Sequence, residues 1–145
     1  MSLVGPRPNV ERETILYTHE EKKLLSVKPG ITDFSSIVFS DEGEILKGAS
    51  DPDITYNQLI RPGKSKLGIF YIENQSISLD IKLCFYTVVA IFSRKNALKM
   101  TARTLQSLNA GKDLIQIASR KMPLKPSPPP GAKKIVTNRE GNPFL

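Results

Sequence analysis

The chain has 145 residues and a formal net charge of +7 at pH 7, and its length fits one domain with a substantial core. A single cysteine, Cys84, excludes an internal disulfide framework, and a single histidine, His19, excludes a His-based metal site and a serine triad. The most apolar run, residues 83–92, is about half of the roughly 20 residues that a spanning helix needs. We therefore expect no bilayer-spanning segment in this sequence.

The positive charge is concentrated in the C-terminal part. From Arg94 onward there are eleven Lys and Arg residues and two acidic residues, which leaves a net charge of −2 on residues 1–93. This asymmetry indicates either a solvated basic tail or contact with a membrane surface, a nucleic acid or a phosphorylated substrate. Binders of single-stranded nucleic acid interleave basic with aromatic residues, yet Phe144 is the only aromatic residue after Phe92. We expect an anionic membrane surface as partner and no nucleic acid.

The first recognisable feature is the loop Gly5-Pro6-Arg7-Pro8. Its two prolines fix their own φ and bias Gly5 and Arg7 away from helical backbone. Arg7 is therefore expected on a stiff, extended loop.

Two short elements follow. Thr18 and Glu21 have the spacing of a capping box, which predicts a short helix that ends before Pro29. The β-branched and aromatic residues of 34–40, bounded by Asp33 and a turn, predict a short strand.

Three helices are expected next. Asp51 ahead of Pro52 predicts a helix start, and Pro62 is expected to break that helix and begin a second one. The third spans residues 78–93, and apolar residues nearly encircle it after Lys82. Such a helix is either buried on all sides or laid into a membrane interface.

Residues 97–145 read as a basic, Pro-rich and largely disordered tail after a domain at residues 1–96. Within the tail, residues 112–121 show a short apolar stripe that fits one more helix, and residues 123–131 read as a polyproline-like spacer. The predicted fold class is α+β and mostly helical.

Four segments in a fixed order connect the sequence to a known family: SLVGPRP, EEKKLL, VKPGIT and FYIENQSISLDIKLCFYT. Together they resemble the C-terminal half of the bacterial sugar transferases, the monotopic phosphoglycosyl transferases. The resemblance covers roughly residues 2–95. It implies the C-terminal portion of a membrane-associated domain at the cytoplasmic face of the bacterial inner membrane.

The resemblance also implies a reaction. A carboxylate attacks the β-phosphate of a UDP-sugar and releases UMP, and polyprenyl phosphate then takes the phosphosugar to begin a surface polysaccharide or glycan. Mg²⁺ is implied as the cofactor that offsets the diphosphate charge.

For the site, the resemblance places Arg7 beside the substrate phosphates, where its planar guanidinium matches phosphate oxygens. Gly5, Pro6 and Pro8 would shape the pocket loop around it. Lys28 occupies a position that is basic in the family and is a second candidate for phosphate binding.

The family's nucleophile belongs to an Asp-Glu pair that lies upstream of GPRP and is followed by Leu-Pro-Gln. We expect that segment ahead of Met1, so no catalytic residue is assigned in this chain. Asp41 and Glu42 are adjacent but lie downstream in a turn, and the role is not transferred to them. The alternative to an enzyme is a catalytically inactive remnant that acts as a binding or scaffold module in the same pathway.

The stretch after VKPGIT departs from the family pattern. Many members continue with a Gly, an aromatic residue or Leu, and Ala-Gln-Val, whereas this chain has Asp33 and residues 34–39. The departure leaves the sugar unassigned.

Overall fold

The computed structural model describes residues 2–5, 18–28, 30–120, 124–131 and 135. Within these ranges the chain is mostly helical, as predicted, and it also contains one two-stranded sheet. The elements, in chain order, are β1 (Ser2–Val4), the 3₁₀ helix η1 (Glu21–Ser26), β2 (Gly30–Thr32), α2 (Phe34–Val38), α3 (Glu42–Leu46), α4 (Pro52–Thr55), the π-helical turn η2 (Tyr56–Ile60), α5 (Arg61–Glu73), α6 (Ile77–Phe92), α7 (Arg94–Ser107) and α8 (Lys112–Ser119). None of the helices described is both long enough and apolar enough to cross a bilayer.

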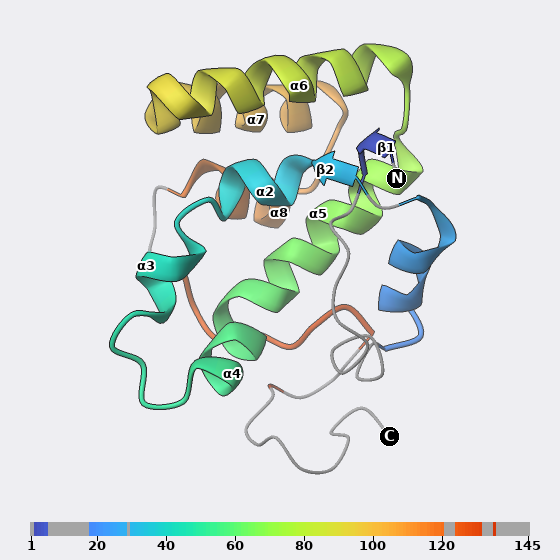
Figure 1. The fold of residues 1–145 in the computed structure, drawn as a ribbon. Coiled ribbons are helices and arrows are strands. Elements are labelled where there is room, and N and C mark those ends of the chain that lie inside the picture. The colour runs from blue at the N-terminus through green and yellow to red at the C-terminus, as the bar shows by residue number, and fades with distance from the viewer. Residues whose placement is uncertain (1, 6–17, 29, 121–123, 132–134, 136–145) are drawn as a thin grey trace.

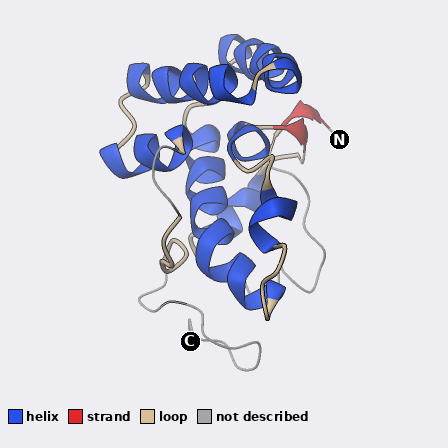
Figure 2. Ribbon diagram, turned by 90° about the vertical axis from the view of Figure 1, so that its left-hand side faces the viewer, coloured by secondary structure: helices blue, strands red, loops and turns tan. Residues whose placement is uncertain are grey.

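The helices are arranged in layers around α5. In Figure 1, α6 and α7 form the upper layer, α2 and α8 lie beneath them, and α5 runs diagonally below. The short sheet sits at one edge of this stack, which Figure 2 shows from the side. The core between the layers includes side chains from α2, α5, α6 and α7, namely Phe34, Ile37, Leu67, Tyr71, Leu83 and Leu105, all at most 1% exposed.

The capping box before η1 is confirmed. The Thr18 amide donates to Glu21 Oε1 at 3.1 Å, and the Glu21 amide donates to Thr18 Oγ1 at 3.2 Å. His19, two residues before the start of η1, is exposed, as expected for a solvated side chain.

The strand predicted for residues 34–40 is wrong, because this segment forms the helix α2. Asp33 and Ser36 make a second capping box, in which Asp33 Oδ1 accepts from the Ser36 amide and Ser36 Oγ accepts from the Asp33 amide, both at 2.9 Å. These two bonds satisfy orphan amides at a helix start and outweigh the β-propensity of the segment.

Pro62 was predicted to break the helix that starts at Pro52 and to begin a second one. A second helix, α5, does begin at this point, but the helical path is not broken. The π-helical turn η2 leads directly into α5, and the Arg61 amide donates to the Tyr56 carbonyl. Pro62 therefore falls in the first turn of α5, where a missing amide costs little.

The expected helix at 78–93 is observed as α6, one residue earlier at each end. Ser76 Oγ caps it by accepting from the Leu79 amide at 3.0 Å. Burial on all sides is contradicted, because only Leu79 and Leu83 of this helix are buried.

Residues 94–119 form α7 and α8, where the sequence predicted one possible helix within a disordered tail. Ala97, Leu98, Leu105 and Ala118 are buried in the core. The strap at residues 124–131 lies against the domain as well, with the Ser127 amide donating to the Gln58 carbonyl at 3.1 Å. These contacts supply the burial that a solvated tail would lack, while the division of the chain into two domains stays a prediction.

Candidate functional site

The short sheet joins two of the motifs that are far apart in the sequence. β1 and β2 are parallel, with Ser2 opposite Gly30 and Val4 opposite Thr32. The Gly5 amide then donates to the Thr32 carbonyl at 3.0 Å. Gly5, the first residue of the GPRP motif, therefore lies at the edge of the sheet where β2 ends, because β1 and β2 are parallel.

A polar cluster surrounds this carboxyl edge. Thr32 Oγ1 lies 2.7 Å from Thr87 Oγ1 of α6 and 2.9 Å from Ser36 Oγ of α2. Thr87 Oγ1 also bonds to the Leu83 carbonyl one turn earlier, at 2.7 Å. These hydroxyls connect the sheet edge to α2 and α6. Thr32, which accepts from the Gly5 amide, is therefore fixed by contacts with both helices.

Asp33 is the titratable group at this edge, and it is 2% exposed. Burial raises the pKa of its carboxyl to about 6, because desolvation disfavours the charged form. The hydrogen bonds from Ser36 and the charge of Lys64 act in the opposite direction and are weaker. The carboxyl thus changes charge close to neutral pH, immediately after β2.

We expect Asp33→Asn to stabilise the protein at pH 7 by roughly 3 kcal/mol, with the free energy of unfolding measured by urea titration. The folded state binds the Asp33 proton more tightly than the unfolded state does, so this group's contribution to stability falls as pH rises from about 4 to about 6 and is constant above. Asparagine keeps an oxygen to accept from the Ser36 amide and cannot ionise. A difference between variant and wild type that does not change between pH 4 and pH 7 would contradict the burial argument.

The predicted site residues are only partly within the described chain. Gly5 is buried at the sheet edge. Pro6, Arg7 and Pro8 lie outside the described residues, so their placement stays a prediction. Lys28 is exposed and precedes β2, so it lies at the end of the sheet opposite to the edge from which Gly5 continues.

The adjacent pair Asp41 and Glu42 has structural partners. Arg120 makes two hydrogen bonds to the Asp41 carboxylate, at 2.8 and 2.9 Å, and Arg94 lies 3.1 Å from it. Glu42 lies 3.4 Å from the Lys64 ammonium. The Asp41 pairs attach α7 and the end of α8 to the α2–α3 corner, which accounts for this residue without a catalytic role.

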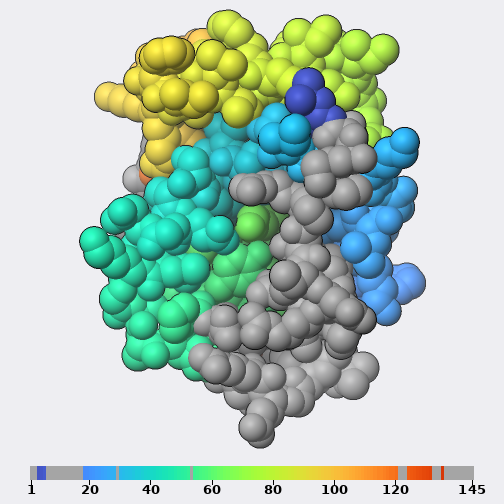
Figure 3. All heavy atoms as spheres, in the orientation of Figure 1, coloured from blue at the N-terminus to red at the C-terminus, as the bar shows by residue number. Residues whose placement is uncertain are grey.

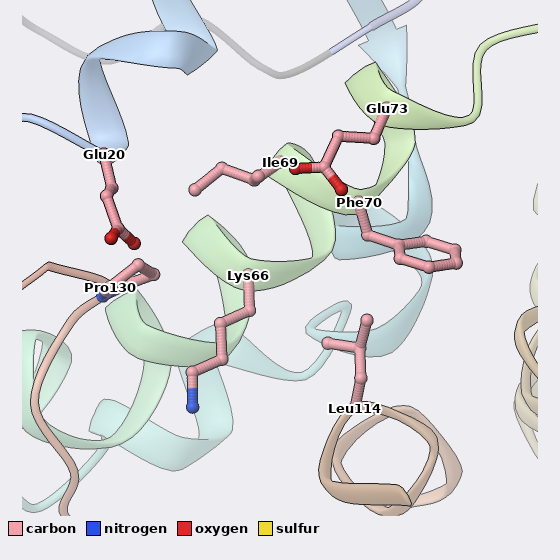
Figure 4. A pocket seen from close by; sticks show the side chains of 7 residues that line it. All are labelled: Glu20, Lys66, Ile69, Phe70, Glu73, Leu114 and Pro130. Atoms are coloured by element: carbon pink, nitrogen blue, oxygen red, sulfur yellow. The ribbon is translucent and has the colours of Figure 1, made fainter. Parts of the chain in front are cut away.

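A pocket of about 330 Å³ lies away from the sheet edge, among η1, α5, α8 and the strap (Figure 4). Figure 4 shows the carboxylate of Glu20 facing Pro130, and Ile69, Phe70 and Leu114 forming apolar walls. The described residues do not gather three or more His, Cys, Asp or Glu side chains that could hold a metal ion. The Mg²⁺ that the family resemblance implies stays a prediction.

Sequence reasoning missed the polar cluster at the sheet edge. The Asp33-x-x-Ser36 spacing was a usable signal, since it is the same capping pattern that identified Thr18 and Glu21. No sequence signal connects Thr87 with Thr32, because that contact depends on how α6 packs over the sheet.

The structure is a small helical domain in which two of the sequence motifs are paired in a parallel sheet. Residues 1–94, more than half of the chain, match the family described as bacterial sugar transferase, so the chain belongs to the bacterial sugar transferase family.

One relative shows how far the similarity extends. The chain is 33% identical over 88 residues to the "uncharacterized sugar transferase EpsL" of Bacillus subtilis (strain 168). The alignment covers 61% of this chain and 36% of that protein, so the chain spans little more than a third of the relative's length. No solved structure matches the chain significantly.

Proposed function

We propose that this chain is the C-terminal part of an enzyme that transfers a sugar-1-phosphate from a UDP-sugar to polyprenyl phosphate at the cytoplasmic face of the bacterial inner membrane. Membership of the sugar transferase family supports the transfer of a sugar group. The observation that carries the finer proposal is the pairing of β1 with β2, which brings the start of the GPRP loop to the end of VKPGIT.

The proposed reaction has two displacement steps. In the first, a carboxylate oxygen bonds to the β-phosphorus of the UDP-sugar, the bond to the bridging oxygen breaks, and UMP leaves. In the second, a phosphate oxygen of polyprenyl phosphate attacks the same phosphorus, the bond between that phosphorus and the carboxylate oxygen breaks, and the carboxylate is released. The carboxylate belongs to the Asp-Glu pair that the family carries upstream of GPRP.

In this proposal the chain's own contribution is a fixed cation. The Arg7 guanidinium offers two parallel donors to the diphosphate oxygens, and the flanking prolines reduce the entropy lost in holding it there. The anchored Gly5 gives the loop a fixed starting point, because its amide is tied to β2 and the adjoining hydroxyls tie β2 to α2 and α6.

We expect Arg7→Ala to lower the rate of UMP release about ten- to 100-fold, the loss expected for a charge-assisted hydrogen bond to phosphate. The assay uses membrane fractions in which the chain is combined with the family's upstream segment that carries the Asp-Glu pair, with polyprenyl phosphate, Mg²⁺ and a panel of UDP-sugars. Lys47→Ala, which removes an exposed cation elsewhere, is the control and should leave the rate unchanged. Equal rates in the two variants would contradict the phosphate role of Arg7, and no release with any sugar would favour the binding or scaffold module instead.

A further inference from the structure

Two oppositely charged side chains face each other near the carboxyl edge of the sheet. Glu42 Oε1 of α3 lies 3.4 Å from the Lys64 ammonium of α5, and the Lys64 and Glu42 side chains are 23% and 36% exposed. The charge of Lys64 also acts on Asp33, where it opposes the rise in pKa. Figure 3 shows α5 bordering α2 and α3 on the face of the molecule that carries the sheet. The pair therefore lies close to the edge where Gly5 begins the GPRP motif.

The backbone that carries this pair is fixed on both sides. The Ser35 hydroxyl of α2 donates to the Lys64 carbonyl at 3.1 Å, which holds this turn of α5 against α2. Glu42 follows Asp41, whose carboxylate is held by two arginines. The pair is thus placed before any ligand arrives, and a ligand that binds it pays little to order the chain.

The π-helical turn η2 forms the third side of the pair. The Lys64 ammonium lies 5.3 Å from the centre of the Tyr56 ring and 3.5 Å from the Tyr56 hydroxyl. Tyr56 is the first residue of η2, and π-helical turns are rare and frequently occur at functional sites. Both the ring and the hydroxyl attract the ammonium, so they keep it beside Glu42.

The chemistry of the pair suits hydroxyl groups. The two polar contacts of the ammonium, at 3.4 and 3.5 Å, are longer than the about 2.7–2.9 Å of a strong charge-assisted bond. An ammonium offers three donors and a carboxylate two acceptor oxygens, so the partly exposed pair can donate to one hydroxyl and accept from its neighbour. Adjacent hydroxyls of this kind are the recognition groups of a neutral sugar. An acidic sugar or a phosphate would bring a second negative charge against Glu42, which is unfavourable.

We propose that the Glu42–Lys64 pair binds hydroxyl groups of a neutral sugar on the UDP-sugar and thereby selects the sugar. This inference rests on the proposed function. The stretch at residues 33–39, in which the chain departs from the family pattern, contacts the pair through Ser35. Sugar selectivity is thus assigned to the part of the chain where it differs from other members.

The test compares UDP-sugars, which carry the sugar, with UDP, which carries only the nucleotide and its phosphates. The chain combined with the family's upstream segment is assayed for UMP release from UDP-glucose, UDP-galactose, UDP-N-acetylglucosamine and UDP-glucuronic acid, with UDP as a competitive inhibitor. We expect Lys64→Met to lower kcat/KM about tenfold for the neutral UDP-sugar that the wild type uses best. The inhibition constant of UDP should stay within about twofold. The matched control, Lys66→Met, alters a lysine of the same helix that lines the pocket of Figure 4, and both constants should be unchanged.

A second variant, Glu42→Gln, tests the role of the carboxylate. Wild type should use its best neutral UDP-sugar at least about tenfold better than UDP-glucuronic acid, and Glu42→Gln should reduce this ratio, because the repelling charge is removed. A wild-type preference for UDP-glucuronic acid would overturn the proposal.

The remaining outcomes separate this inference from the proposed function. UMP release with equal kcat/KM in Lys64→Met and Lys66→Met would contradict the sugar site alone. So would a loss of UDP inhibition in Lys64→Met as large as its loss of kcat/KM, which would assign Lys64 to the diphosphate. If the wild type released UMP from none of the four substrates and UDP did not bind, the proposed function would fail and the sugar site with it.

Discussion

Gly30→Ala is expected to destabilise the protein by more than about 3 kcal/mol and to separate β1 from β2. A Cβ at position 30 would lie 2.2 Å from the Gly5 nitrogen and 2.4 Å from the Val4 carbonyl carbon. Both neighbours are backbone atoms, so no side-chain rotation can relieve the clash. The parallel pairing must open, and the anchor of the GPRP loop is lost with it. Urea unfolding measures the loss of stability.

Gly43→Ala is the matched control for this change. Gly43 lies in α3, and a Cβ added there meets nothing within 4 Å. Since alanine is favoured over glycine in a helix by roughly 0.5–1 kcal/mol, this variant should be as stable as the wild type or more stable. If the two alanine variants unfolded at the same urea concentration, the close contact of the two strands would be wrong.

The local rules of helix capping were predictive, and long-range packing was not. Thr18 and Glu21 form their predicted capping box because the pattern acts within four residues. The same chemistry at Asp33 and Ser36 overrode the β-propensity of residues 34–40. Helix α7 is held to the domain because Leu98 and Leu105 are buried in the core. No local pattern in this basic segment predicts that burial.

The candidate site, too, was predicted only in part. The resemblance identified GPRP and VKPGIT as the segments to examine, and the pairing of Val4 with Thr32 joins them. The burial of Asp33 could not be predicted, because it results from packing of α2 against α5 and α6 rather than from its neighbours in sequence. For α6, the apolar pattern left burial on all sides and a membrane interface open as alternatives, and the fold does not provide the burial.

Arg61→Met is expected to destabilise the protein by about 3–5 kcal/mol, because it leaves the Glu21 carboxylate buried without its charge partner. Glu21 is 0% exposed and accepts from Arg61 Nε at 3.0 Å and Arg61 Nη2 at 2.6 Å. The Ser65 hydroxyl and the Thr18 amide complete its partners. This network fixes η1 against α5, and η1 leads directly into the segment that forms β2.

Lys64→Met on the same helix is the control. Its ammonium lies 3.4 Å from Glu42, and the two side chains are 23% and 36% exposed, so the loss of this pair should cost at most about 1 kcal/mol. The double variant Glu21→Leu/Arg61→Met removes both buried charges and should recover much of the stability lost in Arg61→Met alone. Additive effects of the two substitutions would contradict a coupled pair. Recovery would show that the cost comes from the unpaired carboxylate and that the pair's role is to specify the position of η1.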